Sequence, residues 1–153
     1  MENNSRFPLE LYIHIPFCVK KCAYCDFLSA PADRDAREAY VSALLREIRS
    51  LPGEYGLDNR EVISVFVGGG TPSLLEGIRM KEIMDALREH FLFAPDAEIT
   101  VEANPGTLDR EKLRLYDRSG INRLSLGLQS ASDRELRVLG RIHTYGDFLE
   151  SYR

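Results

Sequence analysis

The sequence has no apolar run long enough to cross a bilayer, since its longest ones fall far short of the roughly 18 residues that a spanning helix needs. It also lacks an excess of positive charge: 20 basic and 24 acidic residues give a net charge of −4. That balance argues against a general nucleic-acid or anionic-membrane surface. Residues 1–6 lack the charged-then-apolar layout of an export signal. We therefore expect a cytoplasmic protein with no integral membrane segment and no nucleic-acid partner.

Cysteine is scarce too, and the three that exist, Cys18, Cys22 and Cys25, lie within eight residues. No second cysteine pair follows, so a closed four-ligand zinc site would need His14 as its fourth ligand. His14 lies in an alternating strand pattern, where a hydrogen-bonded or interior-facing histidine is the simpler interpretation. A disulfide would use two thiols and leave one over. Three thiolates suit a [4Fe–4S] cluster with one iron left open, so we favour a cluster over zinc or unconnected thiols.

The rest of the sequence alternates strand and helix patterns, as in one domain with a core of its own. The expected strands cover 11–15, 62–67, 97–103 and 121–128, and the expected helices 33–51, 78–92 and 108–118, with further helices after Ser132 and from about Thr144. We expect Pro52-Gly53 to end the first helix and Thr107 to cap the third. Ser132 and Glu135 predict a capping box.

Residues able to bind a ligand follow each expected strand at its carboxyl end. The cysteines follow the first strand and Gly68–Pro72 the second, while Glu102 and Gln129 stand at the ends of the third and fourth. A (β/α) barrel builds its active site from these loops, and an open doubly wound sheet also binds ligands there. No G-x-G-x-x-G is present, which disfavours a nucleotide site of the Rossmann type. We predict an α/β fold, a partial (β/α) TIM-type barrel with about four βα units.

The C-x3-C-x2-C spacing, with aromatic Tyr24 before the last cysteine, resembles the radical S-adenosylmethionine (SAM) superfamily. The string from Tyr12 to Cys18, YIHIPFC, resembles the branch that contains the oxygen-independent coproporphyrinogen III oxidases and the HemW-type haem chaperones. That resemblance implies that the cysteines hold a [4Fe–4S] cluster whose open iron binds SAM for reductive cleavage. It also implies a partial barrel of about six strands and a C-terminal region. We therefore expect 1–153 to be the truncated N-terminal portion of such a core, with unpaired strand edges that favour oligomers.

The same resemblance assigns SAM contacts to eight residues: Tyr12, Tyr24, Gly69, Gly70, Thr71, Glu102, Gln129 and Arg141. The glycine run would let the backbone approach and hold the amino group of SAM. Glu102, in an E-x-x-P setting, would accept hydrogen bonds from the ribose hydroxyls. Arg141 would reach the SAM carboxylate, although an arginine in a polar turn is usually only solvated.

Two functions of different class remain open. A haem chaperone would bind haem as cargo and deliver it to an acceptor protein, whereas the oxidase would convert propionates of a porphyrinogen to vinyl groups. The oxidase branch has a fourth cysteine one residue removed from the third, whereas in this chain Cys25 is followed by Asp26 and Phe27, as in HemW-like proteins. We therefore favour the chaperone, leave enzymatic activity undecided, and expect an electron-donor protein as a further partner. A zinc-stabilised structural loop is a third possibility.

Overall fold

The computed structural model describes residues 7–57 and 59–153, so the export-signal prediction for residues 1–6 lies outside the described residues. Four parallel strands form one sheet in the order β1-β2-β3-β4: β1 is Leu9–Ile15, β2 Glu61–Gly69, β3 Leu92–Ala103 and β4 Arg123–Leu126. The helices are α1 Arg34–Tyr55, α2 Gly77–His90, α3 Arg110–Arg118, α4 Asp133–Val138 and α5 Tyr145–Tyr152, with a 3-10 turn η1 at Pro72–Leu74. The predicted α/β order is confirmed.

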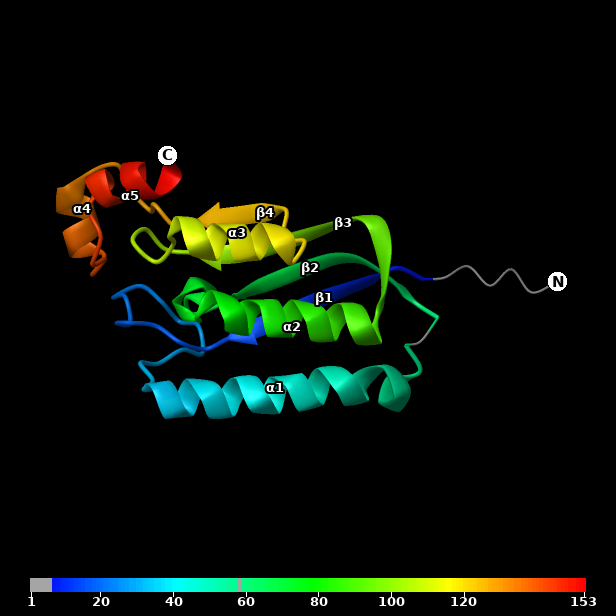
Figure 1. The fold of residues 1–153 in the computed structure, drawn as a ribbon. Coiled ribbons are helices and arrows are strands. Elements are labelled where there is room, and N and C mark those ends of the chain that lie inside the picture. The colour runs from blue at the N-terminus through cyan, green and yellow to red at the C-terminus, as the bar shows by residue number, and fades with distance from the viewer. Residues whose placement is uncertain (1–6, 58) are drawn as a thin grey trace.

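The helices are distributed unevenly around the sheet. Figure 1 shows α1, α2 and α3 side by side along it, while α4, α5 and the loop after β1 lie at the carboxyl ends of the strands. Within the described ranges, no helix is long and apolar enough to cross a membrane. The arrangement leaves loops from several strands together at one end of the molecule.

The core lies between the sheet and the helices. Ile99 and Val101 of β3 and Val67 of β2 are at most 1% exposed, and they pack with Met80 and Met84 of α2. The two methionines therefore fill the core. Successive strand residues point to opposite faces of the sheet. The strand residues that alternate with Ile99, Val101 and Val67 therefore lie on the other face.

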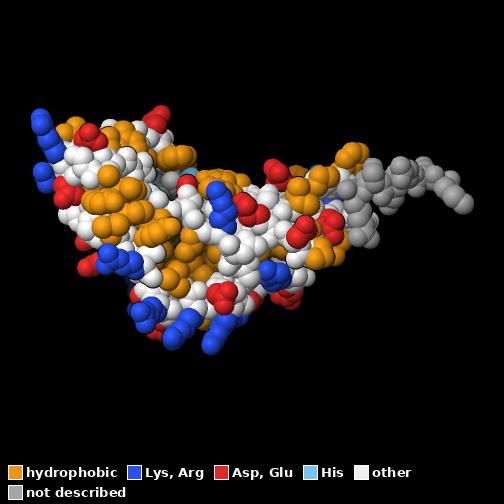
Figure 2. Space-filling model, turned by 90° about the horizontal axis from the view of Figure 1, so that it is seen from above, with side chains coloured by type: hydrophobic (Ala, Val, Ile, Leu, Met, Phe, Trp, Pro, Cys, Tyr) orange, Lys and Arg blue, Asp and Glu red, His pale blue; other side chains and the backbone are white. Residues whose placement is uncertain are grey.

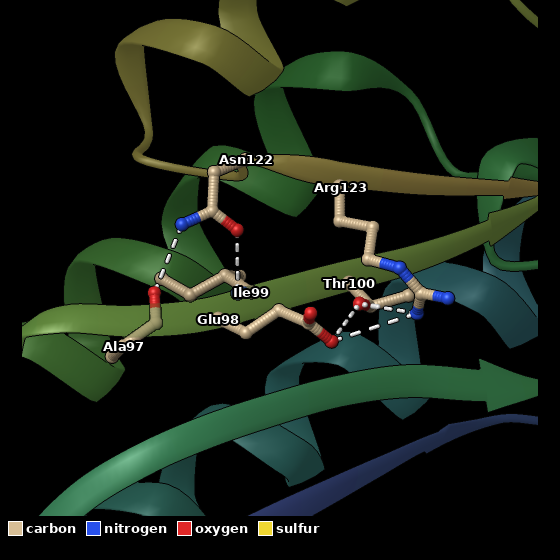
Figure 3. A network of polar contacts seen from close by, with 6 residues as sticks. All are labelled: Ala97, Glu98, Ile99, Thr100, Asn122 and Arg123. Atoms are coloured by element: carbon tan, nitrogen blue, oxygen red, sulfur yellow. Dashed lines mark hydrogen bonds and ion pairs between the residues drawn. The ribbon is translucent and has the colours of Figure 1, made fainter.

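That second face carries a row of paired residues, Tyr12, Phe66, Thr100 and Arg123, in register across the four strands. Thr100 is buried, and a guanidinium nitrogen of Arg123 donates to its hydroxyl at 3.2 Å. Figure 3 shows that the same nitrogen lies against Glu98, 3.5 Å from its carboxylate. The polar groups on this face are thus paired, Thr100 with Glu98 on the same strand and both with Arg123 on the neighbouring strand.

The prediction that Pro52-Gly53 ends the first helix was wrong, because α1 continues to Tyr55. The helix ends at Gly56, whose φ of +63° and N–H bond to the Pro52 carbonyl form a left-handed C-cap. A proline inside a helix removes one backbone hydrogen bond. Pro52 is buried, and the packing of its ring offsets that loss.

Two predicted caps also differ. Asp109, rather than Thr107, caps α3 by accepting a bond from the Lys112 N–H at 2.7 Å. The Thr107 hydroxyl instead donates to the Asn104 carbonyl, which lies outside the helix. Ser132 caps α4 as expected, but the carboxylate of Glu135 accepts from Ser130 and the capping box is not completed. A full box occurs at α5, between Thr144 and Asp147.

We expect Tyr116→Phe to leave the melting temperature unchanged or raise it. Tyr116 lies on α3 and is 2% exposed, its burial raises its pKa, and its hydroxyl has no partner in the described part of the chain. An unsatisfied buried hydroxyl costs about 1–3 kcal/mol, which phenylalanine avoids. The matched control is Tyr40→Phe, because the Tyr40 hydroxyl donates to the His14 carbonyl at 2.6 Å. Thermal melts showing equal losses for both variants would contradict the assignment.

Candidate functional site

The cysteine loop, residues 16–30, leaves β1 and returns to its own starting point. Ala30 donates its N–H to the Pro16 carbonyl at 2.9 Å, and Cys18 donates to the Ala30 carbonyl at 3.1 Å. These bonds form an isolated parallel bridge between Phe17 and Ala30. The base of the loop is therefore fixed to the end of β1.

His14 holds the loop from a second direction. Its Nε2 lies 2.9 Å from the Leu28 carbonyl and its Nδ1 lies 3.0 Å from the Tyr12 hydroxyl. A carbonyl only accepts, so Nε2 carries the proton and Nδ1 accepts from Tyr12. Both ring nitrogens are thus in use, which agrees with the prediction that His14 is hydrogen-bonded rather than a metal ligand.

The three cysteines are free thiols of intermediate exposure. The Thr71 hydroxyl donates to Cys18 Sγ at 3.9 Å, and Arg141 Nη1 donates to Cys22 Sγ at 3.6 Å. All three cysteines line one pocket. In residues 7–57 and 59–153, no group of three histidine, cysteine or acidic side chains has the geometry to hold a metal ion. The donor set nevertheless fits an iron–sulfur cluster, because soft sulfur ligands with hydrogen-bond donors beside them suit it.

The glycine run packs the end of β2 against the cysteine loop. Gly70 donates to the Ile15 carbonyl at 2.8 Å and Thr71 to the Phe17 carbonyl at 2.7 Å. Among these glycines only Gly69 has a positive φ, +117°. A Cβ on Gly70 would lie 2.6 Å from the Phe17 carbonyl oxygen. Close approach to the loop is therefore a reason for glycine here, beside the predicted approach to a ligand. A ligand amino group needs acceptors, so it does not compete for these N–H groups.

We expect Gly70→Ala to destabilise the fold by about 1–3 kcal/mol, because backbone must move to admit the methyl group. Gly53→Ala is the matched control: Gly53 lies in α1, and a Cβ there would have no heavy atom within 4 Å. Alanine favours a helix over glycine by about 0.5–1 kcal/mol, so the control should gain stability. Urea denaturation measures both. A Gly70→Ala protein as stable as the parent would show that the Phe17 contact is not tight.

A pocket at the carboxyl ends of the strands brings together every predicted site residue except Tyr12: Cys18, Cys22, Tyr24, Cys25, Gly69, Gly70, Thr71, Glu102, Gln129 and Arg141. Tyr12 lies beside it on the open face of the sheet, with its ring stacked 6.3 Å from that of Phe66. Partial burial, assisted by the Glu102 carboxylate, raises the pKa of Tyr12. The sequence prediction thus placed these residues at one end of the sheet correctly, while their roles as ligands stay a prediction.

Glu102 and Gln129 stand at the ends of β3 and β4, as predicted. Glu102 Oε2 accepts from the Gly69 N–H at 3.3 Å, which joins β3 to the glycine run. Gln129 has a φ of +69°, a left-handed conformation that no other non-glycine residue of the described chain adopts. Such strained backbone is concentrated at functional sites.

Arg141 is held inside the pocket rather than solvated. Its Nη2 donates to Asn104 Oδ1 at 2.6 Å and to the Gly127 carbonyl at 2.9 Å, and its Nη1 lies 3.5 Å from the Tyr24 hydroxyl. Asn104 Nδ2 in turn donates to the Thr71 hydroxyl at 2.8 Å. Sequence reasoning missed Asn104, although an amide side chain directly after a strand end was the available signal.

The cysteine loop exposes several apolar side chains near the pocket. Phe27, which lines the pocket, is 60% exposed, and Leu28 and Val19 of the same loop are exposed as well. Figure 2 shows hydrophobic side chains at the end of the molecule that carries the cysteine loop, α4 and α5, with Lys and Arg side chains among them. Lys20 lines the pocket, and Lys21 donates to the Phe27 carbonyl at 3.3 Å.

His143 is buried, with Nε2 3.2 Å from the Leu128 carbonyl, and its burial lowers its pKa.

Comparison with known proteins extends this description. The family model described as the Radical SAM superfamily matches residues 12–153. A protein of Escherichia coli (strain K12) named Heme chaperone HemW is 48% identical over 137 residues, which are 89% of this chain and 36% of that protein. A mouse protein named Radical S-adenosyl methionine domain-containing protein 1, mitochondrial, is 39% identical over 142 residues, 92% of this chain and 31% of that protein.

A solved structure is similar as well. Coproporphyrinogen III oxidase (HemN) from Escherichia coli, described as a radical SAM enzyme, matches with a TM-score of 0.84 and 32% identity over 95% of this chain and 34% of that one. The chain therefore spans about a third of the length of the relatives that it matches.

Proposed function

The chain belongs to the radical SAM superfamily, and from that membership we propose that it is a HemW-like protein that binds a [4Fe–4S] cluster and SAM and handles haem as cargo. The support is the 48% identity to a protein named Heme chaperone HemW, together with the pocket that gathers the cysteines and the predicted SAM contacts. Residues 1–153 would form the N-terminal portion of the radical SAM core.

In this proposal Cys18, Cys22 and Cys25 hold the cluster. The cluster and SAM together supply one-electron reductive cleavage of the sulfonium C–S bond, while the protein provides binding and orientation. Hydrogen bonds to cluster sulfurs and thiolates tune the reduction potential. Thr71 and Arg141 donate to the sulfurs of Cys18 and Cys22 and are placed for that purpose.

The remaining pocket residues provide for the different parts of SAM. The backbone carbonyl oxygens of Gly69 and Gly70 would accept hydrogen bonds from the amino group of SAM, and the guanidinium of Arg141 would pair with the SAM carboxylate. The Glu102 carboxylate accepts from the ribose hydroxyls. Tyr24, Thr71 and Gln129 line the rest of the pocket around the ligand, and Tyr12 lies beside the pocket.

The preference for a haem chaperone over an oxidase rests on Phe27. It occupies the position at which the oxidase branch has its fourth cysteine, and its exposed ring lies in the pocket lining. A phenyl ring at this position gives an apolar contact to a flat macrocycle such as haem. It does not supply the thiol that the oxidase branch has there. The second candidate is oxygen-independent coproporphyrinogen III oxidase, favoured by the 0.84 TM-score to that enzyme.

The two candidates are separated by one assay on the full-length protein that carries this sequence, reconstituted anaerobically with iron and sulfide. It receives SAM, a strong reductant and coproporphyrinogen III, and chromatography detects the vinyl product. A parallel titration with haem follows the Soret band. Stoichiometric haem binding without product supports the chaperone, and product formation establishes the oxidase. If the protein neither forms the product nor binds haem, both assignments are refuted, and the protein is a radical SAM protein with another substrate.

The proposal also includes partners and a location. Haem delivery requires a haem-acceptor protein, and reduction of the cluster requires an electron-donor protein. We place the protein in the cytoplasm, because free, clustered thiols persist in a reducing compartment.

A further inference from the structure

Asn104 occupies the junction of three segments around the pocket. It follows β3, and its backbone is fixed by the Ser73 hydroxyl, which accepts from its N–H at 3.3 Å, and by the Thr107 hydroxyl, which donates to its carbonyl at 2.6 Å. Its side chain extends between Thr71 and Arg141, 2.8 and 2.6 Å away. Both ends of the amide are therefore in use, one as a donor and one as an acceptor.

The two partners of this amide each reach a different cysteine. Thr71 donates to Cys18 Sγ, and Arg141 donates to Cys22 Sγ. Among the hydrogen bonds of the described residues, no comparable link leads from Asn104 to Cys25. The network thus touches two cysteines and leaves the third outside.

The amide also fixes the direction of the Thr71 hydroxyl. Asn104 Nδ2 donates to the Thr71 oxygen, so the proton of that hydroxyl is left for Cys18 Sγ. Asn104 Oδ1 and the Gly127 carbonyl hold Nη2 of Arg141. The Arg141 Nε is buried and has no partner in the part of the chain that the structure describes.

We infer that Asn104 is a positioning residue that couples the cluster to the SAM site, by directing Thr71 toward Cys18 and Arg141 toward Cys22 and the SAM carboxylate. The inference rests on the proposed function. Asn104 acts through its neighbours: it sets the orientation of groups that touch the two cofactors.

Two substitutions separate the two halves of the amide. Asn104→Asp keeps the acceptor for Arg141 but cannot donate to Thr71, so the Thr71 proton turns to the new carboxylate and Cys18 loses its donor. The reduction potential should then become more negative, with a small change in SAM affinity. Asn104→Leu removes both contacts and should weaken SAM binding by about tenfold in addition.

The control is another asparagine that joins chain segments by its side-chain amide but lies away from the pocket. Asn122 accepts from the Ile99 N–H at 2.8 Å and donates to the Ala97 carbonyl at 2.9 Å (Figure 3). Asn122→Leu should lower the melting temperature while leaving the potential and the SAM affinity unchanged. It therefore reports what loss of a purely structural amide does.

The experiment uses the full-length protein, with the cluster reconstituted, and measures the midpoint potential by redox titration and the SAM dissociation constant by its effect on the electron paramagnetic resonance signal. The inference is supported if Asn104→Asp shifts the potential and Asn104→Leu changes both quantities, with Asn122→Leu changing neither. It is overturned if both Asn104 variants retain the parent values. A parent protein that binds neither cluster nor SAM refutes the proposed function itself, a result distinct from parent-like variants.

Discussion

Replacing Cys22 with alanine is expected to abolish the iron–sulfur cluster, with loss of its iron, its sulfide and its visible absorbance. Two remaining thiolates cannot occupy three irons of a [4Fe–4S] centre, and no fourth cysteine exists in this sequence to substitute. The measurement is iron and sulfide analysis of anaerobically reconstituted protein, alongside its absorption spectrum.

The matched control for this variant is Lys21→Ala in the same loop. Lys21 is exposed, and within the described residues its side chain bonds only to the Phe27 carbonyl, so its loss should leave iron and sulfide at the parent level. A Cys22→Ala protein that retains full iron and sulfide would show that the ligand assignment is wrong. One zinc and no sulfide in the parent would exclude both radical SAM functions and favour the structural zinc loop.

Glu102→Gln is expected to raise the SAM dissociation constant roughly 10- to 100-fold while the cluster persists. Glutamine can still accept from the Gly69 N–H, so the contact between β3 and the glycine run survives. It loses the charge and one of the two acceptor oxygens offered to the ribose hydroxyls, and bonds to charged groups contribute about 1.5–3 kcal/mol. Anaerobic titration calorimetry measures the affinity.

Glu98→Gln is the control for that experiment. Glu98 lies on the same strand and the same face, but its carboxylate is engaged by the Thr100 hydroxyl at 3.1 Å and by Arg123 (Figure 3). We expect its SAM affinity to match the parent. Equal weakening in both variants would attribute the effect to the sheet rather than to a ribose contact.

The sequence was sufficient to predict the order of elements and the end of the sheet at which the site lies. Buried strands such as β2 show continuous apolar runs, helices show 3.6-residue periodicity, and parallel strands bring their carboxyl ends together. Glu102 and Gln129 could therefore be placed in one pocket from their positions at strand ends alone.

The errors arose where a local signal competes with a distant contact. Pro52 is a helix breaker in isolation, but in the fold its ring is buried and α1 continues. Thr107 is a good cap by type, yet it bonds to Asn104 instead. The links from Asn104 to Thr71 and Arg141 span 33 and 37 residues, so no local pattern reports them.

The bridge between Phe17 and Ala30 has a consequence for how the site can be assembled. Because the loop closes on itself at its base, Cys18 is fixed to the end of β1, and Cys22 and Cys25 lie in the segment 19–29 above the bridge. We expect the adjustment that draws the sulfurs around an inorganic centre to be confined to this short segment and its contacts, such as that of Leu28 with His14. We therefore expect insertion of the centre to be a local event that leaves the sheet folded.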